Sequence, residues 1–311
     1  MDDKHTDLFC IWILYVLAQS EKKKWDEYRN KAVDLTDPLV IELENYFEDM
    51  FKGKIPQYKL PLNTSLYRAR QIKSNKWGDI ETDINSLKDE FFKILLTEDE
   101  FKTFEGSGIP ASPNEIAMLK MLVQKEMDEN QLNKYNEFIM KYSDPNCFYG
   151  FSKSDCGVPP ENKRQTGRLN TENDPYLYLA LNKDTAIYER RPSISQSYSL
   201  ATCETNRELI LVDLRLPREI KFQDDFIVSY LAEKVSEPNT DNDNKFYHIT
   251  QCLSHFLQKK GYDGIIYASA IKKNGVNVML FDENNVTFTS SEIITIDNIT
   301  INYTTNLPFS E

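Results

Sequence analysis

The pattern of apolar and polar residues divides the chain into a largely helical first half and a second half that alternates strands with helices. Asp37, followed by Pro38 in the first turn, starts a helix that is predicted to end near residue 51. It belongs to a predicted helical N-terminal domain, residues 1–60. Helical spacing of apolar residues returns over residues 79–145. We expect this second segment to be a helical insertion within a domain of residues 61–311.

Strand patterns dominate the rest of the chain. Residues 62–70 alternate apolar and polar side chains, which places Arg68 and Arg70 on one face of a strand and Tyr67 on the other. Later segments are rich in Val, Ile, Leu and Tyr, as buried strands are. Further strands are predicted at residues 176–181, 198–202, 208–216, 263–268 and 276–281, a β-ribbon at 285–303, and helices at 184–189 and 246–260. This order predicts an α+β fold.

Composition and charge exclude several classes of function. The formal net charge of the 311 residues is -12, so the chain lacks the positive charge that non-specific nucleic-acid binding requires. The five cysteines form no CxxC pair and are scattered, which is typical of reduced thiols and predicts no metal site. Residues 8–18 are apolar but too few to span a bilayer, and Asp residues precede them where a signal peptide has positive charge. We expect a cytoplasmic protein that binds neither membrane nor nucleic acid.

One segment, residues 155–192, combines charged groups with a buried strand. A Pro-rich loop leads to a turn at Gly167 and Arg168, then to the strand at 176–181 and a short helix that carries Glu189. The chain contains no Gly-rich dinucleotide motif, no P-loop and no GxSxG nucleophile motif. A glutamate in such a position is more often a surface residue than a catalyst, so its role depends on its neighbours.

Three kinds of side chain gather around this segment in the predicted fold. Arginines bind phosphates through paired hydrogen bonds, tyrosine rings stack on flat heterocycles, and a carboxylate stabilises positive charge on a sugar carbon. Together they describe the cleavage of a dinucleotide at an N-glycosidic bond. Taken singly, each arginine also fits a solvated strand edge and each tyrosine fits a hydrophobic core.

Five segments, in order, resemble the RES-domain family, which is named after an Arg, a Glu and a Ser. They are LYRAR at 66–70, GVPP and GRLN within 157–170, PYLYLALNKDTAIYERRP at 175–192, LILVDL at 209–214, and GYDGIIYASAIKKNGVNVMLF at 261–281. The N-terminal helices and the insertion lie outside the short form of the family. They are similar to longer RES proteins in which a helical domain precedes the catalytic one.

The resemblance implies an ADP-ribosyltransferase-like fold and an enzyme that uses NAD+ as its substrate, with no prosthetic group. Carried over, Arg68 binds the pyrophosphate or the adjoining ribose, Glu189 stabilises the oxocarbenium-like transition state, and Ser269 positions one of these groups. Ser199 and Thr250 are open alternatives to Ser269. Further candidates for NAD+ binding are Tyr67, Arg168, Asn170, Tyr178, Tyr267 and Asn277.

The implied activity is hydrolysis or phosphorolysis of NAD+ by a toxin or an anti-phage defence effector. An ADP-ribosyltransferase that modifies a protein is the first alternative, and an inert binding or immunity module is the second. The expected partners are NAD+ and a cognate antitoxin or other regulatory protein. For the N-terminal helices we expect either a regulatory role or an oligomerising one, the second of which would give a homo-oligomer.

Overall fold

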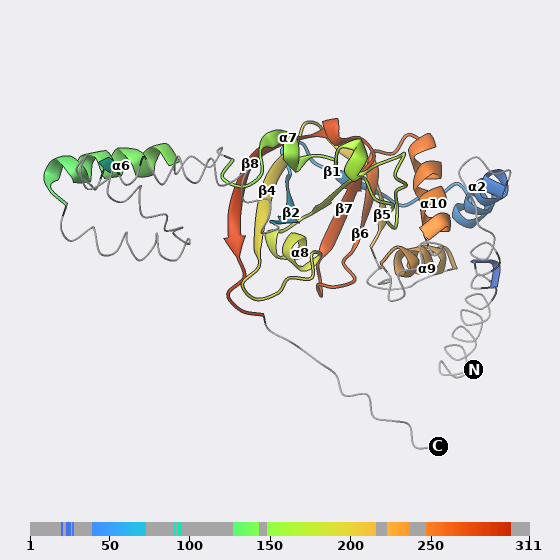
Figure 1. Cartoon of the computed structure of the whole chain (residues 1–311). Helices are drawn as coiled ribbons and strands as arrows, with labels where there is room; N and C mark the ends of the chain where they lie inside the picture. Colours follow the sequence, from blue (N-terminus) through green and yellow to red (C-terminus); the bar gives the residue numbers. More distant parts are fainter. Residues whose placement is uncertain are drawn as a thin grey trace, which may run out of the picture.

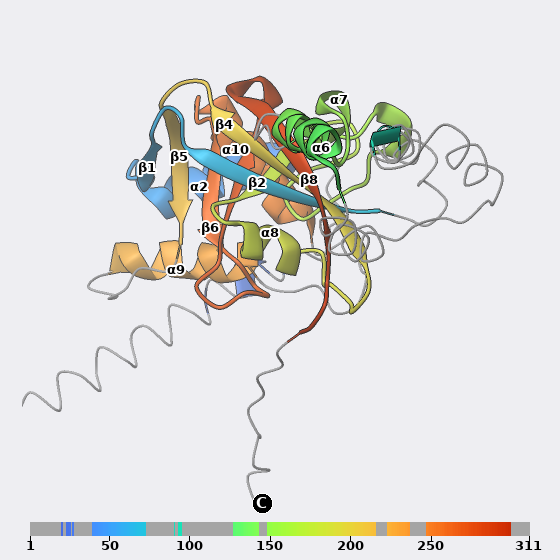
Figure 2. The same cartoon turned by 90° about the vertical axis from the view of Figure 1, so that its left-hand side faces the viewer.

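A single mixed sheet forms the centre of the computed structural model, which describes residues 20, 23–25, 27, 39–72, 90, 93–94, 127–142, 148–215, 223–236 and 247–299. In this part of the chain eight strands pair in the order β1-β5-β6-β7-β3-β2-β4-β8 (Figures 1 and 2). They are β1 (Gln57–Leu60), β2 (Ser65–Gln71), β3 (Leu177–Ala180), β4 (Ser197–Thr205), β5 (Leu209–Leu214), β6 (Gly264–Ala268), β7 (Val276–Leu280) and β8 (Val286–Thr295). Apart from the parallel pair β5 and β6, neighbouring strands run antiparallel. The α+β prediction is confirmed.

Helices cover one face of the sheet in two groups (Figure 1). The described helices are α2 (Leu39–Phe51), α6 (Glu129–Tyr142), α7 (Lys153–Cys156), α8 (Lys183–Tyr188), α9 (Gln223–Ser236) and α10 (His248–Lys259), with 3-10 turns at Glu161–Lys163 and Glu283–Asn285. The first group, α2, α9 and α10, packs against β5, β6 and β7 in one large apolar core. In the second, α8 packs against β2, β3 and β4. A pocket lies on this face of the sheet, between the two groups of helices.

Strand register decides which side chains share this covered face. Tyr67 lies opposite Ala180, Ala180 lies opposite Asn277, and Asn277 lies opposite Tyr267. Directly opposed residues project to the same face, so these four side chains lie on the helix-covered side. Arg68 is opposed to Ala201 and therefore projects to the other face, against the core that contains Cys156.

The N-terminal and C-terminal edges of the sheet differ from the sequence prediction. β1 lies within the predicted helical domain of residues 1–60 but pairs with β5, so the boundary at residue 60 corresponds to no break in the sheet. A four-residue edge strand has too short a pattern to be recognised without its partner. β8 was predicted as part of a ribbon at 285–303; in the described part it is one strand that pairs with the distant β4.

The helical predictions agree with the structure where it describes them. α2 packs on α10 through Phe47 and Phe256, whose ring centroids are 5.6 Å apart, so it shares the core of the sheet. α9 was not predicted. Most of the insertion, residues 79–145, lies outside the described residues; α6 within it is helical and extends away from the sheet (Figures 1 and 2). None of the helices that the structure describes is long and apolar enough to cross a membrane, and residues 8–18 lie outside them.

Three buried thiols are expected to make the fold less stable as the pH becomes alkaline. Burial raises the pKa of Cys156 from 9.0 to about 11, and those of Cys203 and Cys252 to about 12. The unfolded chain therefore releases these protons at lower pH than the folded chain, so the free energy of unfolding falls as pH rises from about 9 towards 12. The pKa of Arg68, lowered to about 9 by burial, acts in the opposite direction.

Urea unfolding of wild type and a double variant, at pH 8 and at about pH 10.5, measures how much the thiols contribute to the pH dependence of the free energy of unfolding. Wild type is expected to lose more stability between the two pH values than the variant with Cys203→Ala and Cys252→Ala, because Ala cannot ionise. An equal loss in both proteins would show that these thiols do not govern the alkaline limb.

Candidate active site

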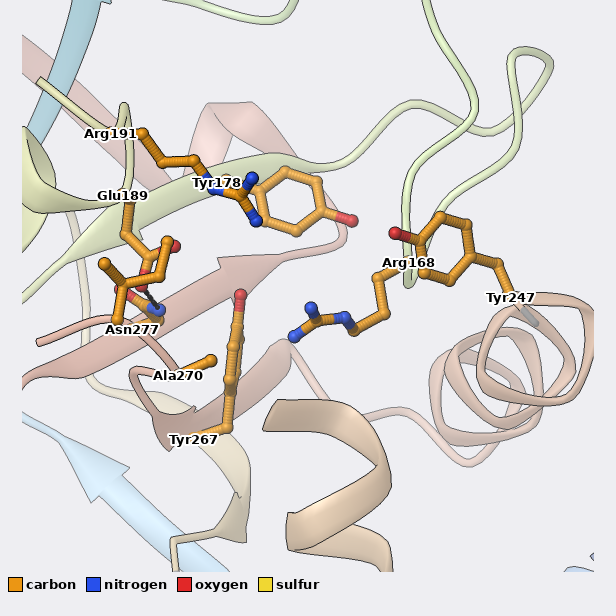
Figure 3. Close-up of a pocket in the computed structure, with 9 residues that line it drawn as sticks. Arg168, Tyr178, Glu189, Arg191, Tyr247, Tyr267, Ala270 and Asn277 are labelled. Carbon is orange, nitrogen blue, oxygen red and sulfur yellow. Dashed lines mark hydrogen bonds between the residues drawn. The ribbon is translucent and has the colours of Figure 1, made fainter. Parts of the chain in front are cut away.

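A pocket of about 170 Å³ lies over β3, β6 and β7, between the end of α8 and the α9–α10 side (Figure 3). It is lined by Arg168, Tyr178, Glu189, Arg191, Tyr247, Tyr267, Ala270, Ile271 and Asn277. Pockets for whole drug-sized ligands measure roughly 300–1,000 Å³, so this one fits a small ligand or a part of a larger one. Its chemistry is set by one carboxylate, two guanidinium groups and three tyrosines.

Glu189 reaches the pocket because α8 is short and sharply bounded. The Asn182 side chain caps the start of α8 by accepting a hydrogen bond from the amide of Thr185 at 2.8 Å. Within α8, Thr185 and Ala186 are the buried residues and face the sheet. The amide of Glu189 donates to the carbonyl of Thr185 at 3.0 Å and closes the last turn. The side chain at this end is half-buried and turns towards the pocket (Figure 3).

Two donors fix the Glu189 carboxylate at a single oxygen. The Ser269 hydroxyl donates to Oε1 at 2.6 Å, and Nδ2 of Asn277 donates to the same oxygen at 2.7 Å. Ser269 Oγ in turn accepts the amide of Lys272 at 2.9 Å, so the turn after β6 holds the serine in place. Within the described residues Oε2 has no hydrogen-bond donor, which leaves it available to a ligand.

Asn277 has a second, unused polar atom. Its side chain is only 5% exposed, and Oδ1 has no hydrogen-bond partner in the part of the chain that the structure describes. A buried acceptor without a donor is unfavourable unless a ligand or water satisfies it. The amide therefore holds Glu189 with one end and presents an acceptor with the other.

The alternatives to Ser269 serve other parts of the fold. Ser199 accepts the amide of Phe151 at 2.8 Å and, being opposed to Arg70, lies on the far face of the sheet. Thr250 donates to the carbonyls of Arg168 and Tyr247 and so supports the pocket wall without lining it. Among these three hydroxyls, Ser269 is the one in contact with Glu189.

Arg68 does not line the pocket. On the opposite face of the sheet, its NH1 group donates to the carbonyls of Cys156, at 2.8 Å, and Gly157. Arg70 binds the carbonyl of Gly157 at 2.7 Å and that of Asp155. Burial, and then the neighbouring charge of Arg70, lower the pKa of Arg68 to about 9. Both arginines therefore hold the C-terminal end of α7, at Asp155, Cys156 and Gly157. They do not reach Glu189, because the alternation that separates Arg68 from Tyr67 also separates it from Glu189.

Arg168 reaches the pocket from a loop that Asn170 organises. Oδ1 of Asn170 accepts the Tyr178 hydroxyl at 2.9 Å, and its Nδ2 donates to the carbonyls of Gln165 and Thr171. This amide is fully used within the fold, and Asn170 does not line the pocket but positions the loop that carries Arg168. Arg168 donates from NH1 to the carbonyl of Val235, while its buried Nε has no partner in the described residues.

Two of the three predicted tyrosines present their rings or hydroxyls to the pocket. The Tyr178 hydroxyl also accepts the amide of Leu169 at 3.2 Å, so its ring is held rigidly against the pocket. The Tyr267 hydroxyl points into the open space and has no partner among the described residues (Figure 3). Burial, followed by the charge of Glu189, raises the pKa of Tyr267. Tyr67 instead packs beside Ala69 and Ala186 beneath α8.

Residues 149–304, half of the chain, match the family model of the RES domain. The chain belongs to the RES-domain family. A chain in the crystal structure of the M. tuberculosis MbcT–MbcA toxin–antitoxin complex is similar at 17% identity and a TM-score of 0.32, over 44% of this chain and 76% of that one. No curated protein matches the chain.

Of the three residues carried over from the RES name, two are in contact, and one of these, Glu189, lines the pocket. Glu189 and Ser269 lie within the matched residues and are hydrogen-bonded, whereas Arg68 lies outside them and on the other face of the sheet. The described residues contain no cluster of metal-ligating side chains. Sequence reasoning missed four lining residues: Arg191, Tyr247, Ala270 and Ile271. For Arg191 the available signal was its place two residues after Glu189.

Proposed function

We propose that this RES-domain protein cleaves NAD+ at the bond between nicotinamide and its ribose. Family membership supports the choice of substrate. The observation that carries the proposal is the Glu189 carboxylate, which Ser269 and Asn277 fix at Oε1 and which has its other oxygen free beside a small aromatic pocket.

The reaction needs negative charge beside the sugar carbon. When the C1′–N bond breaks, its electrons leave with nicotinamide, which becomes neutral, and positive charge develops on the ribose. A fixed carboxylate stabilises that charge in a water-poor site, and Oε2 of Glu189 is placed to accept a ribose hydroxyl. The Asn277 Oδ1 atom is a second acceptor for a hydroxyl or for the carboxamide. Attack of water on the sugar carbon yields ADP-ribose and one proton.

Aromatic side chains suit the planar leaving group. The rings of Tyr178 and Tyr267 both line the pocket with Glu189, and Tyr178 is held by hydrogen bonds to its hydroxyl. Such rings bind flat heterocycles through stacking and apolar burial. The pocket, with a volume of about 170 Å³, holds the nicotinamide ring and part of its ribose in this proposal, with the adjoining phosphate at the pocket rim and the adenosine end outside it.

Depletion of NAD+ in the cytoplasm would make the protein a toxin or a defence effector. We propose a cognate antitoxin that covers this pocket as its regulatory partner. Assembly into homo-oligomers through the N-terminal helices remains a prediction, since most of residues 1–38 lie outside the described part.

The test is to incubate the purified full chain with NAD+ labelled in the adenosine moiety, with and without inorganic phosphate. Nicotinamide should appear in equal amount to ADP-ribose, or to its 1″-phosphate if phosphate is the acceptor. Label attached to protein would instead assign an ADP-ribosyltransferase. Absence of nicotinamide under all conditions would contradict the proposal and favour an inert binding module.

A further inference from the structure

Two neighbouring arginines follow Glu189 and point to different parts of the molecule. Arg191 has a backbone φ of 48°, in the left-handed region that residues other than glycine seldom occupy. A residue in this conformation often ends a helix, but it is usually glycine or asparagine. Here the turn brings the side chain of Arg191 back over the pocket (Figure 3).

Arg190 is the natural comparison for Arg191. It is also exposed, but it does not line the pocket. Its charge acts on Arg68 and Arg70, whose pKa values it helps to lower, and both of these lie on the other face of the sheet. One turn of chain therefore sends two identical side chains into two different environments.

The Arg191 guanidinium has no hydrogen bond or ion pair within the described residues, although the Glu189 carboxylate is two positions away. Arg168 faces it across the pocket with an unpartnered Nε. Figure 3 shows both guanidinium groups directed towards the space in front of the Tyr178 ring and the Tyr267 hydroxyl. The pocket thus offers a free carboxylate oxygen and two cations, one beside Glu189 and one across the pocket from it (Figure 3).

A ligand that satisfies all these groups carries a cationic centre and, a few bonds away, an anionic one. Guanidinium groups bind phosphate oxygens through paired, charge-assisted hydrogen bonds. We infer that Arg191, with Arg168, binds the phosphate attached to the ribose that Glu189 contacts, which is the position that the family resemblance assigned to Arg68. This inference rests on the proposed cleavage of NAD+ and names the residue that distinguishes NAD+ from nicotinamide riboside.

The kinetic test compares three proteins: wild type, Arg191→Gln and Arg190→Gln. Each is assayed on two substrates that share the same glycosidic bond, NAD+ and nicotinamide riboside. Loss of one charge-assisted contact should raise KM for NAD+ by roughly 10- to 100-fold in Arg191→Gln, with kcat little changed. The riboside lacks the phosphate, so its kcat/KM should change less than about twofold. Arg190→Gln should match wild type for both substrates, and Arg191→Lys should recover part of the NAD+ affinity because it keeps the charge without the fork.

A binding measurement separates this inference from the proposed reaction. Calorimetric titration of ADP-ribose into the full chain, in buffer without phosphate, should show binding that is roughly tenfold or more weaker in Arg191→Gln and unchanged in Arg190→Gln. If wild type releases no nicotinamide but shows this pattern, the reaction is wrong and the phosphate contact stands. If wild type does not bind ADP-ribose, or if both variants or both substrates are affected equally, the inference is wrong.

Discussion

Glu189→Gln is expected to reduce the rate of nicotinamide release by about 100- to 1,000-fold, the usual effect of removing a preorganised electrostatic group. Gln has the same shape, and its carbonyl oxygen can still accept from Ser269 and Asn277, so the pocket should keep its geometry. What disappears is the negative charge beside the sugar carbon. The measurement is kcat by chromatographic detection of nicotinamide at saturating NAD+.

The matched control for this change lies in the same helix. Asp184→Asn removes a carboxylate from the exposed first turn of α8, 3.9 Å from Lys272, and outside the pocket. It should retain activity within about twofold, since exposed ion pairs contribute little. Equal thermal stability of the two variants would show that the loss is chemical. A Glu189→Gln protein with more than a third of wild-type kcat would remove Glu189 from the mechanism.

Arg68→Ala is expected to destabilise the protein by about 2 to 3 kcal/mol. The change leaves the carbonyls of Cys156 and Gly157 without this donor and removes a side-chain stem on the face of the sheet whose core contains Cys156. Relief from burying a cation, whose pKa is lowered to about 9, offsets part of the cost. Urea unfolding of Arg68→Ala beside Gln71→Ala, an exposed position on the same strand, measures the effect.

The same variant distinguishes a positioning arginine from one that contacts NAD+. If Arg68 only holds the C-terminal end of α7, the protein that remains folded should bind ADP-ribose with nearly wild-type affinity at low temperature. A variant with unchanged stability and strongly reduced affinity for ADP-ribose would show instead that Arg68 contacts the ligand.

Local periodicity was sufficient to predict α8, the strands on either side of the pocket and the position of Glu189 at a helix end. It also separated Arg68 from Tyr67 correctly, because side-chain alternation is a property of one strand. It could not tell which of these faces meets Glu189. That depends on β7 pairing between β3 and β6, and the β3–β7 partners are 97 to 103 positions apart in sequence.

Other features depended on geometry that no pattern encodes. Asn170 was predicted to bind the ligand; no pattern indicated that its amide also bonds to the Tyr178 hydroxyl and two loop carbonyls. Arg190 and Arg191 look equivalent in sequence, and only a positive φ at the second of them directs it into the pocket. β1 has four residues and is recognisable only through β5.

The parallel pairing of β5 with β6 means that the chain between them must cross over the sheet, which requires a long connection. This connection carries α9 and α10, supplies Tyr247 and binds Arg168 through the carbonyl of Val235. The opposite wall, with Glu189, Ser269 and Asn277, comes from other segments. Changes in the crossover can therefore alter which ligands the pocket admits, while the Glu189 carboxylate and its two hydrogen-bond donors stay as they are.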